Sequence, residues 1–179
     1  MNPLSGSFFM EINSQLAKIK LFVSDFDGVM TDGFVYLDQN GKESVRCSRK
    51  DGFGIELLKK NGVEVAVLSK ENNPVVLARC EKLGVPVWSK MENGDSKLEI
   101  LKKLMANKGL QREEVAYMGD DINDAACLKN VGLAITVADG HPEIKKIANF
   151  ITTAKGGNHA VREVAELILT AQGVQLSSL

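Results

Sequence analysis

The sequence has few of the features that mark secreted, membrane-spanning or nucleic-acid-binding chains. It holds three cysteines in 179 residues, and Cys47, Cys80 and Cys127 form no CxxC or zinc-type spacing. The formal net charge is −1, which lacks the basic excess of a nucleic-acid-binding domain. No apolar run approaches the roughly 20 residues that cross a bilayer, and the first residues lack the basic and apolar stretches of a signal peptide. We therefore expect a reduced, cytoplasmic protein with neither nucleic acid nor membrane as a partner.

What the sequence does have is enough apolar character for one core. Hydrophobic residues make up 44% of the chain and charged residues 25%. Domains commonly contain roughly 100–150 residues, so we predict a single domain over residues 1–179. The ends, about residues 1–15 and 172–179, are expected to be loosely held.

One pattern repeats along the chain: a helical segment ends at a glycine, and an apolar, β-branched run follows. Glycine just past a helix favours a left-handed cap, because it has no Cβ that would clash. The glycines in this position are Gly62, Gly84 and Gly132. The short apolar runs predict strands buried on both faces, namely Val63–Leu68, Val115–Met118 and Leu133–Val137. Alternating helices and strands imply right-handed crossovers, so we predict an α/β three-layer sandwich with a mostly parallel sheet.

One segment departs from this pattern. In "DGFVYLDQNGKESVRC", two short strand-like runs flank Asn40-Gly41, which is a strong hairpin signal. We predict a β-hairpin over about residues 33–48. It either forms a flap over the neighbouring acidic loop or is an ordinary edge hairpin.

Polar side chains follow the predicted strands. In "KIKLFVSDFDGVMTDG", Asp25 and Asp27 come directly after an apolar run. "VAVLSKEN" ends its strand at Ser69, and "NGDSKLEIL" places Lys97 near a helix start. "YMGDDINDAA" follows another strand and carries Asp120, Asp121 and Asp124. Because ligands bind at the carboxyl ends of parallel strands, the sheet is expected to gather these groups into one cleft.

Paired carboxylates of this kind call for a cation. Two carboxylates about 4 Å apart repel by roughly 1 kcal/mol in water and about 4 kcal/mol at an effective dielectric constant of 20. Mg²⁺ prefers hard oxygen ligands and pairs carboxylates with phosphate oxygens, so it is the expected cofactor. Beside Mg²⁺, an aspartate can attack phosphorus and form an aspartyl-phosphate. Lys97 would then balance charge on the phosphoryl oxygens, and Ser69 would donate a hydrogen bond to one of them.

The same residues also have plainer roles. An aspartate at a strand end is often a turn former, and the alternative role of "GDDIND" is to cap the helix that starts at Ile122. A single DxD, lysine or serine is a weak signal. The ordered set of DxDG, serine, lysine and GDDxxD, each at a strand end or helix start, is specific.

That ordered set resembles the haloacid dehalogenase superfamily of phosphohydrolases, over roughly Lys18 to Leu169. The resemblance implies a Rossmann-like sheet, with Asp25 as nucleophile. It implies that Asp27 protonates the leaving oxygen and then activates the hydrolytic water. Mg²⁺ would be held by Asp25, the backbone carbonyl of Asp27 and Asp120, with Asp121 and Asp124 behind these ligands or linked through water.

The short gaps between the motifs resemble the branch of that superfamily without a large cap. The pattern that ends in "KGGNHAVRE" is similar to phosphatases of 3-deoxy-manno-octulosonate 8-phosphate and of nonulosonate 9-phosphates, which are sialic-acid-type sugars. It also resembles the C-terminal domain of some cytidylyltransferases for such sugars. This subgroup implies a homotetramer in which a neighbour covers the site. It implies that the hairpin lies at the subunit interface and that "KGGNHAVRE" lies near a substrate site.

The stretch after Ser69 departs from the octulosonate enzymes, which usually read Thr-Gly-Arg. This chain has Lys70 where glycine is usual and Glu71 at the third position, followed by Arg79 and Lys82 on the next helix. Glu71 is predicted to accept hydrogen bonds from sugar hydroxyls, and Arg79 to pair with a carboxylate. The alternative is a solvated helix face. We expect a 2-keto-3-deoxy sugar acid phosphate as substrate, with nine carbons favoured over eight.

Three rival functions remain open. A phosphorylated signalling receiver also uses an acidic cluster, a hydroxyl and a lysine, but its aspartate usually ends a middle strand. A non-catalytic tetramerisation or regulatory domain, associated with a cytidylyltransferase, tends to lose the nucleophile or metal carboxylates that are present here. A phosphatase for quite different sugar or nucleotide phosphates is the third.

Overall fold

The computed structural model describes residues 6–71, 73–89 and 96–178, and a six-stranded parallel sheet lies at its centre. The strand order is β5-β4-β1-β6-β7-β8, and each neighbouring pair is parallel. In chain order these strands are β1 (Leu21–Ser24), β4 (Glu64–Leu68), β5 (Val87–Trp88), β6 (Val115–Met118), β7 (Leu133–Thr136) and β8 (Phe150–Ile151). The predicted parallel sheet is confirmed.

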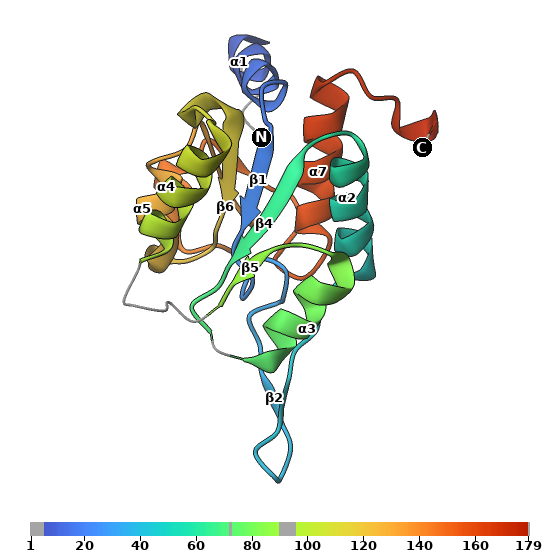
Figure 1. Cartoon of the computed structure of the whole chain (residues 1–179), viewed down its shortest axis with the longest axis vertical. Helices are drawn as coiled ribbons and strands as arrows, with labels where there is room; N and C mark the ends of the chain where they lie inside the picture. The colour runs from blue at the N-terminus through green and yellow to red at the C-terminus, as the bar shows by residue number, and fades with distance from the viewer. Residues whose placement is uncertain (1–5, 72, 90–95, 179) are drawn as a thin grey trace.

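Helices cover both faces of this sheet (Figure 1). One buried cluster joins the sheet to α1 (Gly6–Leu16), α2 (Arg49–Lys60), α3 (Pro74–Leu83) and α7 (Ala160–Ala171). The other joins it to α4 (Lys97–Lys108), α5 (Ala125–Leu128) and α6 (Pro142–Ile147). Short 3-10 turns are η2 (Arg112–Glu114), η3 (Ile122–Asp124) and η4 (Leu176–Ser178). The fold is therefore the predicted three-layer α/β sandwich.

The central strands form because their side chains are apolar on both faces. Phe22 of β1 packs into the cluster with α2 and α7, while Leu21 and Val23 pack into the opposite cluster with α4. Successive residues of a strand point to opposite faces, so a continuous apolar run suits a strand with helices on both sides. The predicted bounds of β4, β6 and β7 are correct to within one residue.

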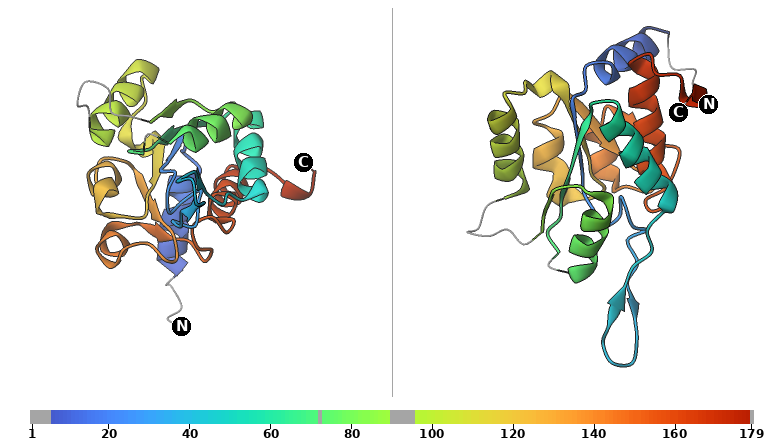
Figure 2. Two further views of the ribbon diagram at one scale, coloured as in Figure 1. Left: turned by 90° about the horizontal axis from the view of Figure 1, so that it is seen from below. Right: turned by 45° about the vertical axis from the view of Figure 1, so that its right-hand side comes forward.

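A two-stranded antiparallel hairpin leaves the carboxyl edge of the sheet, as Figures 1 and 2 show. It consists of β2 (Tyr36–Leu37) and β3 (Glu43–Ser44). Its turn is closed by Asp38, whose carboxylate accepts hydrogen bonds from the backbone N–H groups of Asn40 and Lys42. Gly41 adopts a φ of +75°, which glycine tolerates without a steric penalty. The predicted hairpin is confirmed, and the described residues contain no large cap domain.

One local expectation was wrong. Gly62 and Gly84 have the expected left-handed backbone, but Gly132 does not. Helix α5 already ends at Leu128, and Gly132 is instead packed so tightly that a Cβ would lie 2.6 Å from Cα of Glu113.

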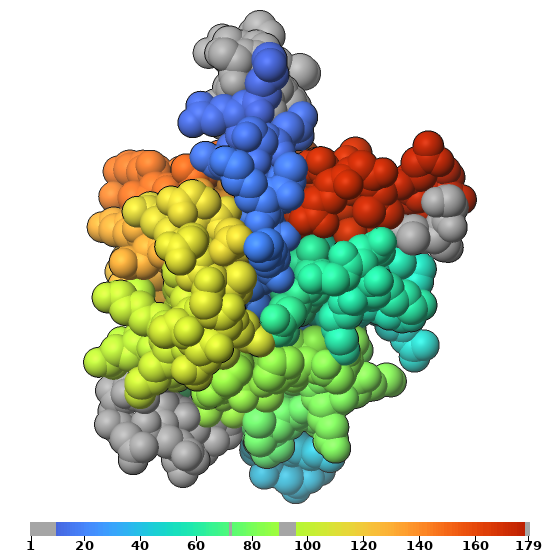
Figure 3. Space-filling view, turned by 45° about the horizontal axis from the view of Figure 1, so that its top comes forward, coloured from blue at the N-terminus to red at the C-terminus, as the bar shows by residue number. Residues whose placement is uncertain are grey.

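The beginning of the chain forms a helix that packs on the core. Gly6–Leu16 is helical, and Ile12 and Leu16, which share one helix face, are buried in the core. Helix α1 packs beside α7, and Figure 3 shows the two in contact. Residues 1–5 and 179 lie outside the described part of the chain.

Candidate active site

The site lies at the carboxyl edge of the sheet, where the loops after β1, β4 and β6 meet. Strand β1 pairs with β4 on one side and with β6 on the other. The chain builds β4 and β5 on one flank of β1 and then crosses to β6, β7 and β8 on the other. Such a switch point leaves a crevice at the strand ends, where ligands bind in open α/β sheets.

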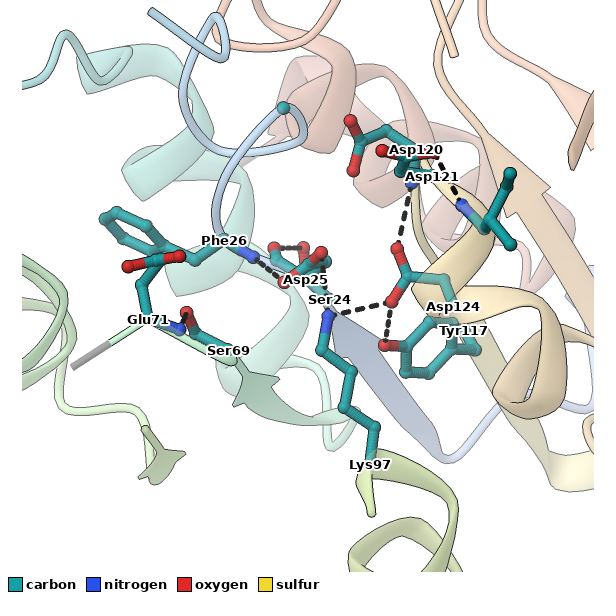
Figure 4. Close-up of polar contacts among 12 residues, drawn as sticks. Ser24, Asp25, Phe26, Ser69, Glu71, Lys97, Tyr117, Asp120, Asp121 and Asp124 are labelled. Atoms are coloured by element: carbon teal, nitrogen blue, oxygen red, sulfur yellow. Dashed lines mark hydrogen bonds and ion pairs between the residues drawn. The ribbon is translucent and has the colours of Figure 1, made fainter. Parts of the chain in front are cut away.

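Asp25 is fixed at the end of β1. Its backbone N–H donates to the Met118 carbonyl at 2.8 Å, which continues the pairing with β6. The N–H of Phe26 donates to Asp25 Oδ1 at 2.7 Å, and Lys97 Nζ lies 2.8 Å from Oδ2 (Figure 4). The Asp25 residue is only 4% exposed. Burial, together with the nearby charge of Asp124, raises its pKa well above the usual range.

Lys97 bridges two buried carboxylates. It is the first residue of α4, whose start is fixed by a capping box between Ser96 and Glu99. Its Nζ lies 2.8 Å from both Asp25 Oδ2 and Asp124 Oδ1. Burial opposes the charge of Lys97, but Asp25 and Asp124 outweigh it and raise the lysine pKa. The ammonium of Lys97 therefore stays charged although the residue is only 2% exposed.

Three carboxylates gather closely enough to share a cation. Asp25, Asp120 and Asp124 each offer an oxygen, and these oxygens lie within 4.8 Å of one another. Burial, followed by the charges of Asp124 and Asp121, raises the pKa of Asp120 to about 7. A concentration of negative charge that Lys97 offsets only in part, built from hard oxygen donors, fits a divalent cation such as Mg²⁺.

Asp121 and Asp124 lie in different environments, although the sequence analysis gave them the same role. Asp121 is exposed, and its Oδ1 accepts a hydrogen bond from the Ile122 N–H at 2.7 Å, which caps η3. Asp124 is fully buried, and its Oδ2 accepts a 3.2 Å bond from the Asp120 N–H. Asp124 therefore belongs to the carboxylate cluster, while Asp121 lies at its rim (Figure 4).

Asp27 borders a cavity of about 360 Å³ between the hairpin and the start of α3. Glu43 of the hairpin and Glu71 share the wall of this cavity with apolar side chains such as Phe34. Burial and the charge of Glu71 raise the pKa of Asp27, and Glu43 adds to the shift. Asn73 Nδ2 donates to Glu43 Oε2 at 2.5 Å, so the hairpin is tied to the residue that caps α3.

Ser69 directly follows β4 and lies on the side of Asp25 opposite to Asp120 and Asp124 (Figure 4). It is buried, and its Oγ accepts a hydrogen bond from the Glu71 N–H at 3.1 Å. The hydroxyl proton is thereby left to donate. Lys70 and Glu71 are exposed beside it.

The structure does not bring Arg79 and Lys82 to the site. Arg79 Nη2 donates to the Ser48 carbonyl at 2.9 Å, at the start of α2. Lys82 is exposed and lines a separate hollow with Glu56 and Lys59 of α2. Each helical residue advances by about 1.5 Å, so both positions lie well along α3, away from its first residue Pro74. Their contact with substrate stays a prediction.

Glycines hold the nucleophile loop close to its neighbours. Gly28 has a φ of +76°, and a Cβ there would lie 2.0 Å from Asp120 Oδ2. A Cβ on Gly156 would lie 1.9 Å from the Gly28 carbonyl oxygen. The "KGGNHAVRE" stretch thus begins as a support beneath the loop of Asp25. Further along it, His159 Nδ1 hydrogen-bonds with Ser48 Oγ at 2.8 Å.

Sequence reasoning missed several residues that shape the site. Tyr117 donates its hydroxyl to Asp124 Oδ1 at 2.7 Å, and Ser24 Oγ donates to the Asp25 carbonyl at 2.6 Å. Thr31 Oγ1 accepts from the N–H groups of Gly28 and Gly33. The signal for Tyr117 was available, because a phenol on a strand buried on both faces needs a hydrogen-bond partner.

A larger cavity of about 860 Å³ lies between the starts of α2 and α7. Its lining includes Arg49, Phe53, His159 and Arg162, and none of the clustered carboxylates. Among the described residues, no helix combines the length and the apolar character needed to cross a membrane.

A parallel α/β sheet that presents a buried aspartate, a lysine and an acidic cluster able to hold a cation at one edge defines a hydrolase suited to phosphate esters. The chain belongs to the haloacid dehalogenase-like hydrolases, whose family model matches residues 64–164. The match begins at β4 and includes Ser69, Lys97 and the acidic loop after β6, and it ends within α7.

Named relatives lie within this family. The 3-deoxy-D-manno-octulosonate 8-phosphate phosphatase of Escherichia coli strain K12 is 36% identical over 169 residues, which cover 94% of this chain and 88% of the relative. The crystal structure of the Yersinia pestis phosphatase of the same name has a TM-score of 0.85 at 37% identity, covering 91% of this chain and 87% of that one.

A second crystal structure is described with ligands. It is the 3-deoxy-D-manno-octulosonate 8-phosphate phosphatase of Moraxella catarrhalis, in complex with a magnesium ion, a phosphate ion and a KDO molecule. Its TM-score is 0.85 at 35% identity, over 91% of this chain and 92% of that one. The chain is thus similar over most of its length to phosphatases of a sugar acid phosphate.

Proposed function

We propose that this protein is a Mg²⁺-dependent phosphatase that hydrolyses a 2-keto-3-deoxy sugar acid phosphate through an aspartyl-phosphate on Asp25. The observation that carries the proposal is the Asp25 carboxylate, which is buried against Lys97 and beside the other clustered carboxylates. Phosphoryl transfer needs an in-line nucleophile and fixed charge around it more than it needs elaborate proton transfer. This arrangement supplies both.

The reaction would proceed in two displacements. First, a carboxylate oxygen of Asp25 attacks phosphorus, the bond to the sugar oxygen breaks, and Asp27 gives its proton to that oxygen. Then Asp27 takes a proton from water, the water oxygen attacks phosphorus, and the acyl-phosphate bond breaks to return Asp25 and release phosphate. The raised pKa of Asp27 suits a group that must carry a proton before the first displacement.

Lys97 and Ser69 would contact the phosphoryl group from opposite sides. Lys97 uses its ammonium on Asp25 and Asp124, and a lysine has three N–H donors, so a further one is available for a phosphoryl oxygen. The Ser69 hydroxyl would donate from the opposite side. Asp25, Asp120 and the backbone carbonyl of Asp27 would hold Mg²⁺, with Asp124 beside them. The ion would neutralise charge that develops on the phosphoryl oxygens.

The cavity beside Asp27 favours a leaving group rich in hydroxyls. Asp27, Glu43 and Glu71 border it, and none of the described residues that line it is cationic. A sugar's carboxylate would be repelled there, whereas hydroxyl groups would donate to the carboxylates. A nine-carbon acid phosphate places one more hydroxyl-bearing carbon between the phosphate and the ring than an eight-carbon one. We therefore favour a nonulosonate 9-phosphate.

Octulosonate 8-phosphate is the second candidate, because the relatives reported above carry that substrate in their names. The deciding experiment measures phosphate release from both acids and from a panel of other sugar and nucleotide phosphates, with Mg²⁺ and with EDTA. We expect Mg²⁺-dependent turnover of a 2-keto-3-deoxy acid phosphate that Asp25→Asn abolishes. A folded protein that releases phosphate from neither acid would overturn the proposal and favour another substrate or a tetramerisation domain.

Glu71→Arg tests the choice between the two acids. We expect this variant to lose kcat/KM on the nine-carbon substrate and to gain on the eight-carbon one. Glu81→Arg makes the same change of charge at an exposed position of α3 and serves as the control. An unchanged ratio in Glu71→Arg would remove Glu71 from the account of specificity.

We also propose that the enzyme is a cytoplasmic homotetramer in which the hairpin meets a neighbour. Phe34 is 70% exposed and Leu37 is 67% exposed, and Val35 and Tyr36 between them are also exposed. Contiguous apolar surface of this kind marks an interaction site. Sedimentation equilibrium should give a tetramer. The double variant Phe34→Ser, Leu37→Ser should weaken it, whereas Leu77→Ser, at an exposed position of α3, should not. A monomeric parent protein would contradict this.

A further inference from the structure

The hydroxyl of Tyr117 reaches the carboxylate cluster from strand β6 of the sheet. Tyr117 lies on β6, is fully buried, and packs its ring into the apolar cluster with α4 and α5. Its hydroxyl donates to Asp124 Oδ1 at 2.7 Å, and Lys97 Nζ lies 2.8 Å from the same oxygen. Figure 4 shows the phenol, the carboxylate and the ammonium in contact at this point.

We propose that Tyr117 is a positioning residue of the phosphatase reaction, whose hydroxyl fixes the Asp124 carboxylate and through it the ammonium of Lys97. The proposal rests on the aspartyl-phosphate mechanism proposed above. It assigns Tyr117 no contact with substrate.

The geometry makes Asp124 the pivot of the cluster. Its Oδ2 accepts the longer bond, 3.2 Å, from the Asp120 N–H, while Oδ1 contacts both Tyr117 and Lys97. A carboxylate rotates about its terminal bond unless its oxygens are held. The Tyr117 hydroxyl stops this rotation from the rigid side of the site, because β6 is a central strand of the sheet.

Fixing Asp124 matters because Lys97 has two anchors. Its Nζ spans from Asp124 Oδ1 to Asp25 Oδ2, at 2.8 Å from each. If Asp124 turned, the ammonium would follow Asp25 or Asp124 and would no longer point one N–H at the phosphoryl group. A displacement of about 1 Å in a catalytic group can reduce the rate by about 100-fold.

The competing explanation is that the hydroxyl only satisfies a buried polar atom in the core. That role predicts a loss of stability and no selective effect on the chemical step. The positioning role predicts a loss of transition-state stabilisation, because Lys97 is needed most when charge spreads over the phosphoryl oxygens.

Tyr117→Phe separates these two roles. We expect its kcat to fall about 10- to 100-fold while KM changes less than about threefold. The inhibition constant of vanadate, which mimics the five-coordinate phosphorus, should rise in parallel with the fall in kcat, and that of phosphate should not. The control is Val131→Ala, which disturbs the same apolar cluster without a polar contact to Asp124. It should lose stability and keep its kcat.

A double-mutant cycle with Asp124→Asn tests the route of the effect. If Tyr117 acts through Asp124, Tyr117→Phe should change kcat less than about threefold in the Asp124→Asn background. The same loss in both backgrounds, or a kcat for Tyr117→Phe within twofold of the parent enzyme, would overturn the inference. The parent enzyme is measured first: its inactivity on every substrate would refute the proposed function, whereas an active parent with a Tyr117→Phe kcat within twofold of its own refutes only the role of Tyr117.

Discussion

Lys97 carries the positive charge that lets Asp25 and Asp124 lie together in the protein interior. Lys97→Met keeps the length of the side chain and removes this charge. We expect the free energy of unfolding, measured by urea without Mg²⁺, to fall by about 3–5 kcal/mol, because removing one partner leaves buried carboxylates uncompensated. Activity should fall below detection in a phosphate-release assay.

The matched control is Lys102→Met on the exposed face of the same helix. Its unfolding free energy should change by less than about 0.5 kcal/mol. If both variants unfold at the same urea concentration, Lys97 does not hold the cluster together.

Site residues could be predicted from the sequence where the position of the backbone alone brings them together. Asp25, Ser69 and Asp120 follow neighbouring parallel strands, so the topology brings them to one edge, and Lys97 arrives at a helix start beside them. The direction of Arg79 was less predictable, because a helical side chain points where its turn directs it, and this turn faces Ser48. The different environments of Asp121 and Asp124 depend on the short turn η3, whose course the pattern of residues does not specify.

The loops around the nucleophile depend on backbones that touch. Gly156→Ala should push the Gly156 and Gly28 loops apart, because the added Cβ would lie 1.9 Å from the Gly28 carbonyl oxygen. That oxygen belongs to the backbone, so it cannot move aside as a flexible side chain would. We expect the melting temperature to fall by several degrees, corresponding to more than about 1 kcal/mol, and kcat to fall at least tenfold. Differential scanning calorimetry and a phosphate-release assay check the two effects.

Gly109→Ala is the control, because Gly109 has a φ of +64° with nothing within 4 Å of the added Cβ. It should lose about 1 kcal/mol through backbone strain and keep its activity. Full activity in Gly156→Ala would show that the support beneath the Asp25 loop can move without consequence.

The helices and strands that carry a long apolar pattern were predictable, and those set by distant contacts were not. Strands β4, β6 and β7 are continuous apolar runs whose only stable place is between two helical layers. Gly132 was taken for a helix cap, yet its small size serves close packing against Glu113, which lies far away in the sequence. Helix α1 buries Ile12 and Leu16, and α7 provides the surface that stabilises it.

For the molecule as a whole, the strand order decides which loops share a site. Because β1 lies between β4 and β6, three loops distant in the sequence converge on one group of charges. The enzyme class followed from that convergence and from the ordered motifs. The proposed substrate rests instead on the cavity between the hairpin and α3, where Glu43 and Glu71 come from separate parts of the chain.

The concentration of carboxylates also links the stability of the whole fold to pH and to Mg²⁺. The pKa of Asp120 is raised from 3.8 to about 7 by burial, Asp124 and Asp121, and that of Asp25 shifts in the same direction. A carboxyl with a raised pKa binds its proton more tightly in the folded state. Its contribution to stability is therefore full below the unfolded pKa, near pH 4, and is lost as the pH rises through about 7.

We therefore expect the melting temperature of the metal-free protein to fall between pH 5.5 and pH 8.5. Mg²⁺ competes with the proton for the same oxygens, so its apparent affinity should weaken by up to about tenfold per pH unit below about 7. The stabilisation by Mg²⁺ should accordingly be small at pH 5.5 and large at pH 8.5. Asp120→Asn should reduce both the pH slope and the Mg²⁺ effect. An equal Mg²⁺ stabilisation at the two pH values would mean that the ion does not displace the proton of Asp120, and that the cluster is not where the ion binds.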